Sequence, residues 1–534
     1  MDEPGRPTPT LRAVNPWLIA VAVTVPTFME VLDTSIANVA LRYIAGGLSA
    51  ASNDSEWVIT SYLAANAIVL PLSGWLSTFF GRRRYFLLSV AGFTISSLLC
   101  GLATNLESLI LFRILQGLAG GGLQPCTQGV LLDSFPKEKQ GAAMTVFAIA
   151  TLIAPILGPT LGGWITDNYT WRWIFFINVP TGLLALAMCA AVLEDPPYLK
   201  AQRAEFLRKP IRFDTIGLGL IIIGLASLEI VLSKGQEWDW FGDPFHRVHL
   251  LVAGVVGGLS LAVWWELRVE SPVVDFRPLA DRNFAACAVI IFCAYGVLFG
   301  STTTLPGMLQ TLFGYDAVHA GLVLSPAGFF SLMMLPVVVG LLSRGVDARA
   351  LILVGALVMA TGCYWMSQLN LFISPWQVVW PRVVQIVGLS ILFTPLNVAA
   401  YASLDPRLRG AAVGLFALLR NEGGSVGTSI AKTLRDRREQ FHVERLGEWL
   451  DPLNPNLADA FGELRTTFYG MTGDPAGATV MAWQRVSDVR NREALSLAYF
   501  DCFWAFAVLA LTLVPLVFLM KRAVAEKGAH LAAE

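Results

Sequence analysis

Charged residues are scarce in this sequence. Asp, Glu, Lys and Arg make up only 14% of its 534 residues, whereas 55% are apolar and the mean hydropathy is +0.59. A soluble core of this size could not enclose so much apolar material, so we expect a lipid bilayer as the solvent. The formal net charge is −1, and no nucleic-acid partner is expected.

The sequence also lacks the patterns of metal, redox and catalytic sites. Its seven cysteines all fall inside apolar stretches, so they offer neither a disulfide pair nor a zinc cluster. His246 and His249 lie close together, but no third ligand accompanies them. No Gly-rich phosphate loop, HExxH motif or serine or cysteine nucleophile motif occurs, which argues against a membrane-embedded enzyme. We therefore predict no metal, no cofactor and no enzymatic activity.

The apolar residues occur in blocks of roughly 20, with the charges in the gaps, as in helices that cross a bilayer. The first block is too long for a signal-peptide core and has no cleavage pattern after it, so we interpret it as a retained span. The pattern predicts an all-α polytopic membrane protein with fourteen transmembrane helices. The expected spans are 17–40, 57–80, 85–103, 106–130, 141–165, 171–192, 214–233, 248–268, 284–306, 318–342, 350–370, 376–402, 410–433 and 496–520.

Lys and Arg are concentrated in alternate loops. Because basic residues stay on the cytoplasmic side of a membrane, this pattern predicts that both termini are cytoplasmic. The expected organisation is a cytoplasmic tail at 1–16, a six-helix bundle at 17–192, a linker with two extra transmembrane helices at 193–283, a second six-helix bundle at 284–520 with a long outer loop at 434–495, and a cytoplasmic tail at 521–534. That outer loop is a small ordered cap or a partner contact, with a flexible linker as the alternative.

An internal repeat relates the two bundles at an offset of 269 residues. The offset places Arg113 on Arg382 and Gln116 on Gln385. It also aligns Gly141-Ala142-Ala143, Phe147-Ala148 and Gly158 with Gly410-Ala411-Ala412, Phe416-Ala417 and Gly427. Duplicated halves are typical of secondary transporters, in which two bundles rock about a midplane site.

Two acids in the first span are candidates for a function. Glu30 and Asp33 are three residues apart and share a helical face, with Thr34 and Asn38 nearby. A charge inside a span is costly, so it usually faces a bundle interior or water and serves a function. A protonatable acid there could change its charge during transport, whereas a permanently satisfied structural acid is the alternative.

Other charges fall within predicted spans. Arg113 cannot lose its proton, so it needs a partner, for which we predict Asp33. Arg382 lies nearer the start of its span, where it could extend outward to the interface. Arg420 and Glu422 point to different faces of one helix and should not pair with each other. For Glu422 a role in cation or proton binding and a structural tie to Arg382 both remain open.

Two further patterns have a structural interpretation. Glu229 lies one turn from Lys234 and is expected to extend to the interface, without a role. In the fifth span the run Ala154 to Gly163 combines two prolines with small residues at close-packing spacing. A kinked, tightly packed helix of this kind suits an interface between moving bundles.

Several motifs together resemble the major facilitator superfamily, specifically its fourteen-span drug:proton antiporter branch, over nearly the whole chain. They are Leu32-Asp33-Thr34-Ser35-Ile36-Ala37-Asn38-Val39-Ala40-Leu41, Arg113-Ile114-Leu115-Gln116-Gly117, Gly158-Pro159-Thr160-Leu161-Gly162-Gly163 and Trp171-Arg172-Trp173-Ile174-Phe175-Phe176-Ile177-Asn178-Val179-Pro180 with Asp214-Thr215-Ile216-Gly217. Residues 234–241 and the 434–495 loop further resemble permeases that work with a periplasmic adaptor and an outer-membrane channel.

The resemblance implies the major facilitator fold, arranged as six plus two plus six helices in the cell inner membrane. It implies proton-driven export of hydrophobic or amphipathic drug-like molecules by alternating access, powered by the proton-motive force. The expected partners are membrane lipid, protons, a periplasmic adaptor and an outer-membrane channel. A dedicated exporter of one metabolite or siderophore is the alternative that the same scaffold permits.

The resemblance and the residues above assign three sets of candidate positions. Expected proton-coupling residues are Asp33, Arg113, Glu30 and Glu422. Candidates to line the substrate cavity are Asn38, Gln116, Gln385 and Arg420. Candidates for the conformational interface are Gly158, Pro159, Gly162 and Gly163. Two positions depart from the family pattern, because Thr78 stands where an acid is usual and Glu422 where a neutral residue is expected.

Overall fold

The computed structural model of the chain describes residues 15–136, 139–208, 214–269, 272–402, 404, 408–451 and 454–521. Within these ranges every regular element is a helix. The predicted tails at 1–16 and 521–534 lie almost entirely outside the described residues, so their location stays a prediction.

The N-terminal half begins with a helix capped by Asn15, whose side chain accepts a hydrogen bond from the backbone of Trp17. Prolines 155 and 159 interrupt the backbone ladder of its longest later helix, which bends there by 45°. The helices of this half are α1 (Pro16–Gly47), α2 (Ser52–Ser55), α3 (Trp57–Phe80), α4 (Arg82–Leu102), α5 (Leu106–Gly120), α6 (Leu123–Ser134), α7 (Gln140–Asn168), α8 (Trp173–Phe176) and α9 (Asn178–Val192).

The linker is also helical. Asp214 caps its first long apolar helix by accepting a hydrogen bond from the backbone of Gly217 at 2.8 Å. That helix packs against α3 and α17, while the second long helix packs mainly against the first. The elements of the linker are α10 (Pro197–Arg208), α11 (Thr215–Lys234), η2 (Trp240–Gly242), α12 (Arg247–Glu266) and η3 (Arg277–Ala280).

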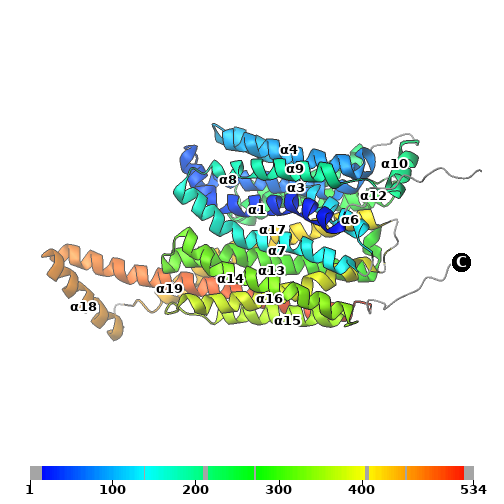
Figure 1. Cartoon of the computed structure of the whole chain (residues 1–534). Coiled ribbons are helices and arrows are strands. Elements are labelled where there is room, and N and C mark those ends of the chain that lie inside the picture. The colour runs from blue at the N-terminus through cyan, green and yellow to red at the C-terminus, as the bar shows by residue number, and fades with distance from the viewer. Residues whose placement is uncertain are drawn as a thin grey trace, which may run out of the picture.

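The C-terminal half contains the longest helix of the chain, α17, with 39 residues. Its helices are α13 (Arg282–Phe313), α14 (Ala317–Ser343), α15 (Ala348–Ser367), α16 (Pro375–Ala402), α17 (Arg409–Gly447), α18 (Pro455–Thr472), α19 (Pro475–Leu511) and α20 (Leu513–Phe518). Figure 1 shows most of this half as a green-to-orange layer below the blue and cyan helices of the N-terminal half, with the yellow α17 between α1 and α7 in this view. The two halves meet chiefly where α7 packs on α14 and α3 on α17.

Twelve described helical segments are long and apolar enough to cross a membrane, and the bent α7 makes a thirteenth if it counts as one span. The protein is therefore a multi-pass membrane protein. Helix α17 is not among these segments, and its middle carries Arg420 and Glu422. Because α17 packs against α3, α13 and α19, it occupies the place of the expected thirteenth span. The total of fourteen stays a prediction.

The described part of the 434–495 segment is helical, as the ordered-cap alternative expects and the flexible-linker alternative does not. Helix α17 continues to Gly447, α18 follows, and α19 begins at Pro475, so the described part is a helical hairpin that projects beyond the bundle (Figure 1). Asp501 anchors its base by accepting hydrogen bonds from Arg438 at 2.5 Å and from His442 at 2.8 Å. The charged residues that interrupt the hydropathy pattern here lie on helices with exposed polar faces.

Glycines allow the closest helix contacts. At Gly427 of α17, an added Cβ atom would lie 2.1 Å from the backbone oxygen of Gly296 on α13. The two backbones therefore touch directly, as in other membrane helix pairs whose interfaces consist of small residues.

This contact predicts different outcomes for two glycine substitutions. Gly427→Ala should lower the thermal unfolding temperature of the purified protein, because the backbones of α13 and α17 must separate. Gly257→Ala is the matched control, since its added Cβ atom meets nothing within 4 Å and gains up to about 1 kcal/mol of helix propensity. Equal unfolding temperatures for the two variants would contradict the described contact.

Candidate functional site

The predicted partnership of Asp33 and Arg113 is present at the centre of the N-terminal half. Arg113 on α5 donates a hydrogen bond from Nη1 to Oδ2 of Asp33 on α1 at 2.5 Å. Both side chains are completely buried, with exposed fractions of 0% and 1%. The face of the Tyr62 ring lies 4.2 Å from the guanidinium carbon. In so dry a place each charge needs the other, because an unpaired ion would be strongly destabilising.

Neutral groups complete this cluster. Oδ1 of Asp33 accepts hydrogen bonds from Asn178 on α9 at 2.7 Å and from Gln116 on α5 at 3.2 Å. Gln116 also accepts a hydrogen bond from Arg113 at 2.8 Å, as expected for residues three apart on a helix. Asn178 was not among the predicted site residues, although a polar side chain inside an apolar span is a usable signal. Asn38 instead donates to the carbonyl of Thr34 in its own helix.

The C-terminal half repeats this arrangement without the acid. Arg382 donates to Gln385 at 2.8 Å, the same pair and distance as Arg113 and Gln116. Its other partners are the hydroxyl oxygens of Ser301 and Thr302, both at 2.7 Å. The 269-residue offset places Thr302 on Asp33, so a neutral hydroxyl replaces the carboxylate.

The position of Arg382 corrects the expectation that it extends to the interface. Its side chain is fully buried on α16, and its partners are neutral. A buried arginine can therefore be held in this fold by oxygens of hydroxyl and amide groups alone. The same would hold for Arg113 if Asp33 took up a proton and became neutral.

A second polar group connects the two halves. Glu30 on α1 accepts hydrogen bonds at Oε1 from Asn66 on α3 and Gln124 on α6, each at 3.1 Å. The carbonyl oxygen of the Gln124 side chain in turn accepts a hydrogen bond from Arg420 on α17. Gln124 thus relays between an acid of one half and a base of the other.

Arg420 lies between aromatic rings of both halves. Its guanidinium carbon is 5.3 Å from the ring centre of Phe147 on α7 and 5.6 Å from that of Tyr295 on α13. A parallel bridge joins Asn421 on α17 to Asn66 at 3.2 Å. As expected, no hydrogen bond or ion pair joins Arg420 to Glu422 among the described residues.

One of the two alternatives for Glu422 does not form, and Glu229 differs from the expectation for it. Glu422 is only 3% exposed, and neither of its carboxyl oxygens has a hydrogen-bond partner within the described structure, so the tie to Arg382 does not form. Glu229 is 2% exposed and accepts a hydrogen bond from Ser425 on α17, so it does not extend to the interface. The predicted exposure of Glu229 was wrong because helix packing, not distance to a span end, determines burial.

The fifth-span motif packs within its own half. Added Cβ atoms at Gly158 and Gly162 of α7 would collide with or closely approach Ser35 and Ile36 of α1. These two glycines therefore bring α7 against α1 instead of against the other half. The contact with the other half belongs to Thr160, which an added Cβ atom at Gly321 of α14 would meet. Pro159 and Gly163 are buried on the same helix.

The inner loop after α3 has its own charge contacts although Thr78 replaces the usual acid. Arg82 forms an ion pair with Asp133 on α6. Asp195, just before α10, accepts a hydrogen bond from the backbone of Arg83 at 2.8 Å. The acid that faces this loop thus comes from a distant part of the sequence.

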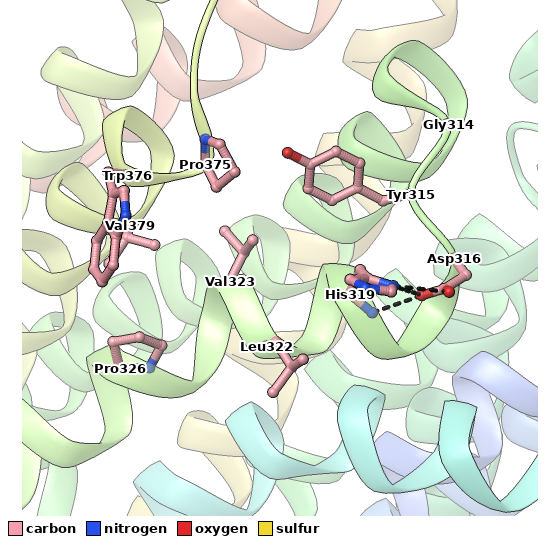
Figure 2. Close-up of a pocket in the computed structure, with 10 residues that line it drawn as sticks. All are labelled: Gly314, Tyr315, Asp316, His319, Leu322, Val323, Pro326, Pro375, Trp376 and Val379. Carbon is pink, nitrogen blue, oxygen red and sulfur yellow. Dashed lines mark hydrogen bonds and ion pairs between the residues drawn. The ribbon is translucent and has the colours of Figure 1, made fainter.

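A separate cavity of about 730 Å³ lies between the starts of α14 and α16. Figure 2 shows its mainly apolar lining, including Leu322 and Trp376, with the hydrogen-bonded pair Asp316 and His319 at one edge. Hydrogen bonds from the backbone and ring of His319 hold the pKa of the exposed Asp316 carboxyl below its usual value. None of the buried charges described above lines this cavity.

Comparison with known proteins gives a consistent result. Residues 24–428 match the Major Facilitator Superfamily. The chain is 35% identical over 509 residues to the multidrug export protein EmrB of Escherichia coli strain K12, covering 94% of this chain and 95% of that protein. It is 39% identical over 439 residues to EmrB of Haemophilus influenzae, covering 82% and 84%. The fold resembles that of the human organic anion transporter MFSD10 with a TM-score of 0.55 at 13% identity, covering 94% and 100%.

The buried pair predicts unequal effects for its two partners. Arg113→Ala leaves the Asp33 carboxylate without its cation and should cost about 3–5 kcal/mol of stability. Asp33→Asn should cost less, because an amide oxygen can accept from Arg113 as Thr302 does from Arg382. Thermal unfolding in detergent would compare them. A loss equal for both variants would contradict this interpretation.

Proposed function

Because the chain belongs to the major facilitator superfamily, we propose that it exports hydrophobic or amphipathic drug-like molecules in exchange for protons. The family membership makes it a secondary transporter and not an enzyme. The names of its EmrB relatives support multidrug export, and their similarity extends over nearly the whole chain.

The buried ion pair of Asp33 and Arg113 is the observation that supports proton coupling most directly. A proton on Asp33 removes the charge that holds Arg113, and the 2.5 Å contact loses most of its electrostatic attraction. Arg113 then depends on neutral oxygens, as Arg382 already does in the other half. Protonation therefore changes the interactions of α1 with α5 without leaving an unsatisfied charge.

The relay through Gln124 can pass such a change to the other half. Glu30 lies one turn from Asp33 on the same face of α1, and Gln124 connects it to Arg420. A proton on Glu30 weakens its acceptor strength toward Gln124 and Asn66. The polar contact between the halves is then easier to break, which is what alternating access requires.

The surroundings of Arg420 suit an amphipathic substrate. The rings of Phe147 and Tyr295 offer apolar and cation-binding faces, and Gln124 offers a hydrogen-bonding amide next to them. Gln116 and Gln385 are fully buried, and each accepts a hydrogen bond from the arginine of its own half. We assign them to holding the arginines and not to contacting substrate.

The projecting hairpin supports a partner outside the bilayer. Met471 on α18 (73% exposed), Val480 on α19 (67%) and Trp449 in the turn after α17 (71%) are large apolar side chains open to solvent. We propose that this hairpin contacts a periplasmic adaptor, which connects the protein in the cell inner membrane to an outer-membrane channel. Both termini then face the cytoplasm, on the opposite side of the membrane from the hairpin.

Proton coupling predicts the behaviour of Asp33→Asn in proteoliposomes. Substrate-dependent proton movement and uphill efflux should be lost, while the protein stays folded because the amide still binds Arg113. Glu107→Gln is the control, since Glu107 is an exposed acid in the first turn of α5. Unchanged proton movement in folded Asp33→Asn would refute the assignment, and loss of a single export product in a deletion strain would favour a dedicated exporter.

The proposed adaptor contact predicts that removal of the hairpin impairs assembly without impairing transport. Replacing residues 448–474 by a short flexible loop should abolish co-purification with the host's periplasmic adaptor but leave transport in proteoliposomes intact. The anchor at Asp501 lies outside this deletion, so the bundle keeps its contacts. Retained co-purification would show that the adaptor binds elsewhere.

A further inference from the structure

Two buried acids outside the Asp33 cluster lie where the linker meets the C-terminal half. Ser425 of α17 donates to both carboxyl oxygens of Glu229 on α11, at 2.9 Å and 3.2 Å. Glu422 is three residues before Ser425, so it lies on the same face of α17. Its carboxyl group interacts electrostatically with Glu229. The two carboxyl groups therefore share one small region between α11 and α17.

No cation of the described chain neutralises this pair. Neither oxygen of Glu422 has a hydrogen-bond partner within the described structure, although the side chain is only 3% exposed. Two carboxylates this deeply buried cannot both keep their negative charge, because the low dielectric strengthens their repulsion and removes their hydration. At least one of them must carry a proton or a bound cation.

The charged groups on the neighbouring helices are engaged elsewhere. On α12, Arg247 pairs with Asp243, and Glu266 accepts hydrogen bonds from the backbone of residues 273 and 274. Helix α3, and α13 after its first residue, carry no Asp, Glu, Lys, Arg or His. Asp133 on α6 is paired with Arg82, and Asp501 on α19 with Arg438. On α17 itself, Arg420 donates to Gln124.

A second group of charged residues lies one turn further along α11. Its positive and negative charges are equal in number. Lys234 is 2.6 Å from Glu237 and 3.5 Å from Glu56, and Lys432 is 2.8 Å from Glu56. These ions lie between the acid pair and the predicted outer surface. They offer carboxylates along which a proton from outside can approach Glu229.

We propose that Glu229 and Glu422 form a second proton-binding site, in which the inserted helix α11 and the transport helix α17 share one proton during the cycle. The proposal rests on the proposed proton-driven export. It assigns a role to an inserted helix that packs on both halves, through α3 and α17. Loss of the proton sets two negative charges against each other and pushes α11 away from α17, so proton occupancy biases how the halves move.

The composition of the site favours a proton over a metal ion. Hard divalent cations require six or more oxygen ligands, whereas two carboxyl groups and one hydroxyl group supply five oxygens at most. A shared proton needs only one donor and one acceptor oxygen, as in pairs of carboxyl groups that hold a single proton.

The first test measures thermal unfolding of the full-length protein in detergent as a function of pH. The wild-type protein should lose stability as the pH rises from mildly acidic to mildly alkaline, because the shared proton is removed. Glu422→Gln mimics the protonated acid and should lose several degrees less. Glu107→Gln, an exposed acid, should follow the wild-type curve. Identical pH dependence for wild type and Glu422→Gln would overturn the proposal.

The second test measures coupling in proteoliposomes with ethidium as the probe, an imposed pH gradient and the membrane potential clamped at zero. One proton fewer per cycle lowers the sustained ethidium ratio about tenfold per pH unit of gradient. Glu422→Gln and Glu229→Gln should each show this loss, and the double variant should lose no more than either. An unchanged ratio in both single variants would overturn the proposal.

Two further experiments distinguish a bound metal ion from a proton, and the second site from the Asp33 site. Replacing sodium by choline at constant pH should change nothing, whereas sodium-dependent stability that Glu422→Gln abolishes would identify a metal ion in place of the proton. Asp33→Asn reports on the proposed function independently. If Asp33→Asn keeps its coupling while the Glu422 variants lose theirs, the Asp33 assignment fails and the second site stands. If only Asp33→Asn loses coupling, the second site fails.

Discussion

The cost of placing a charge inside a membrane-embedded core is the constraint on which the rest of this structure depends. Arg113 cannot discard its proton, so it needs oxygen acceptors around it, and the one that Asp33 supplies joins α1 to α5. Asn178 and Gln116 then orient the remaining oxygen of the acid, which adds α9 to the same cluster. The packing of three helices in the N-terminal half thus follows from one ion pair and its hydrogen bonds.

Comparison of the two halves separates what the fold requires from what the function requires. Both halves hold a buried arginine with a glutamine three residues later, at the same 2.8 Å distance. The fold therefore needs an arginine with oxygen acceptors at this place in each half. At this arginine only the N-terminal half has an ionisable acid, because Asp33 occupies the position that Thr302 has in the other half. Around the buried arginines the duplicated halves thus differ by an exchange of carboxyl for hydroxyl.

The inserted helices and the hairpin extend a compact transporter in two directions. Helix α11 packs on both halves and places Glu229 against α17, so the linker is part of the transport unit. The hairpin of α18 and α19 leaves the bundle and exposes aromatic and apolar side chains. Large exposed apolar residues on a polar, projecting element are typical of a surface that meets a partner.

The sequence by itself determined the membrane class, the approximate spans, the internal repeat and the pairing of Asp33 with Arg113. These follow from local composition, from self-similarity and from the rule that a buried cation needs an anion. Only the tertiary structure decided that Arg382 is buried among hydroxyls, that Gly158 faces Ser35 of its own half, and that Glu229 meets α17. A hydropathy pattern gives the depth of a residue along its own helix, but not its neighbours on other helices. Those neighbours depend on contacts between segments hundreds of residues apart, and they decide whether an acid is solvated, paired or left to share a proton.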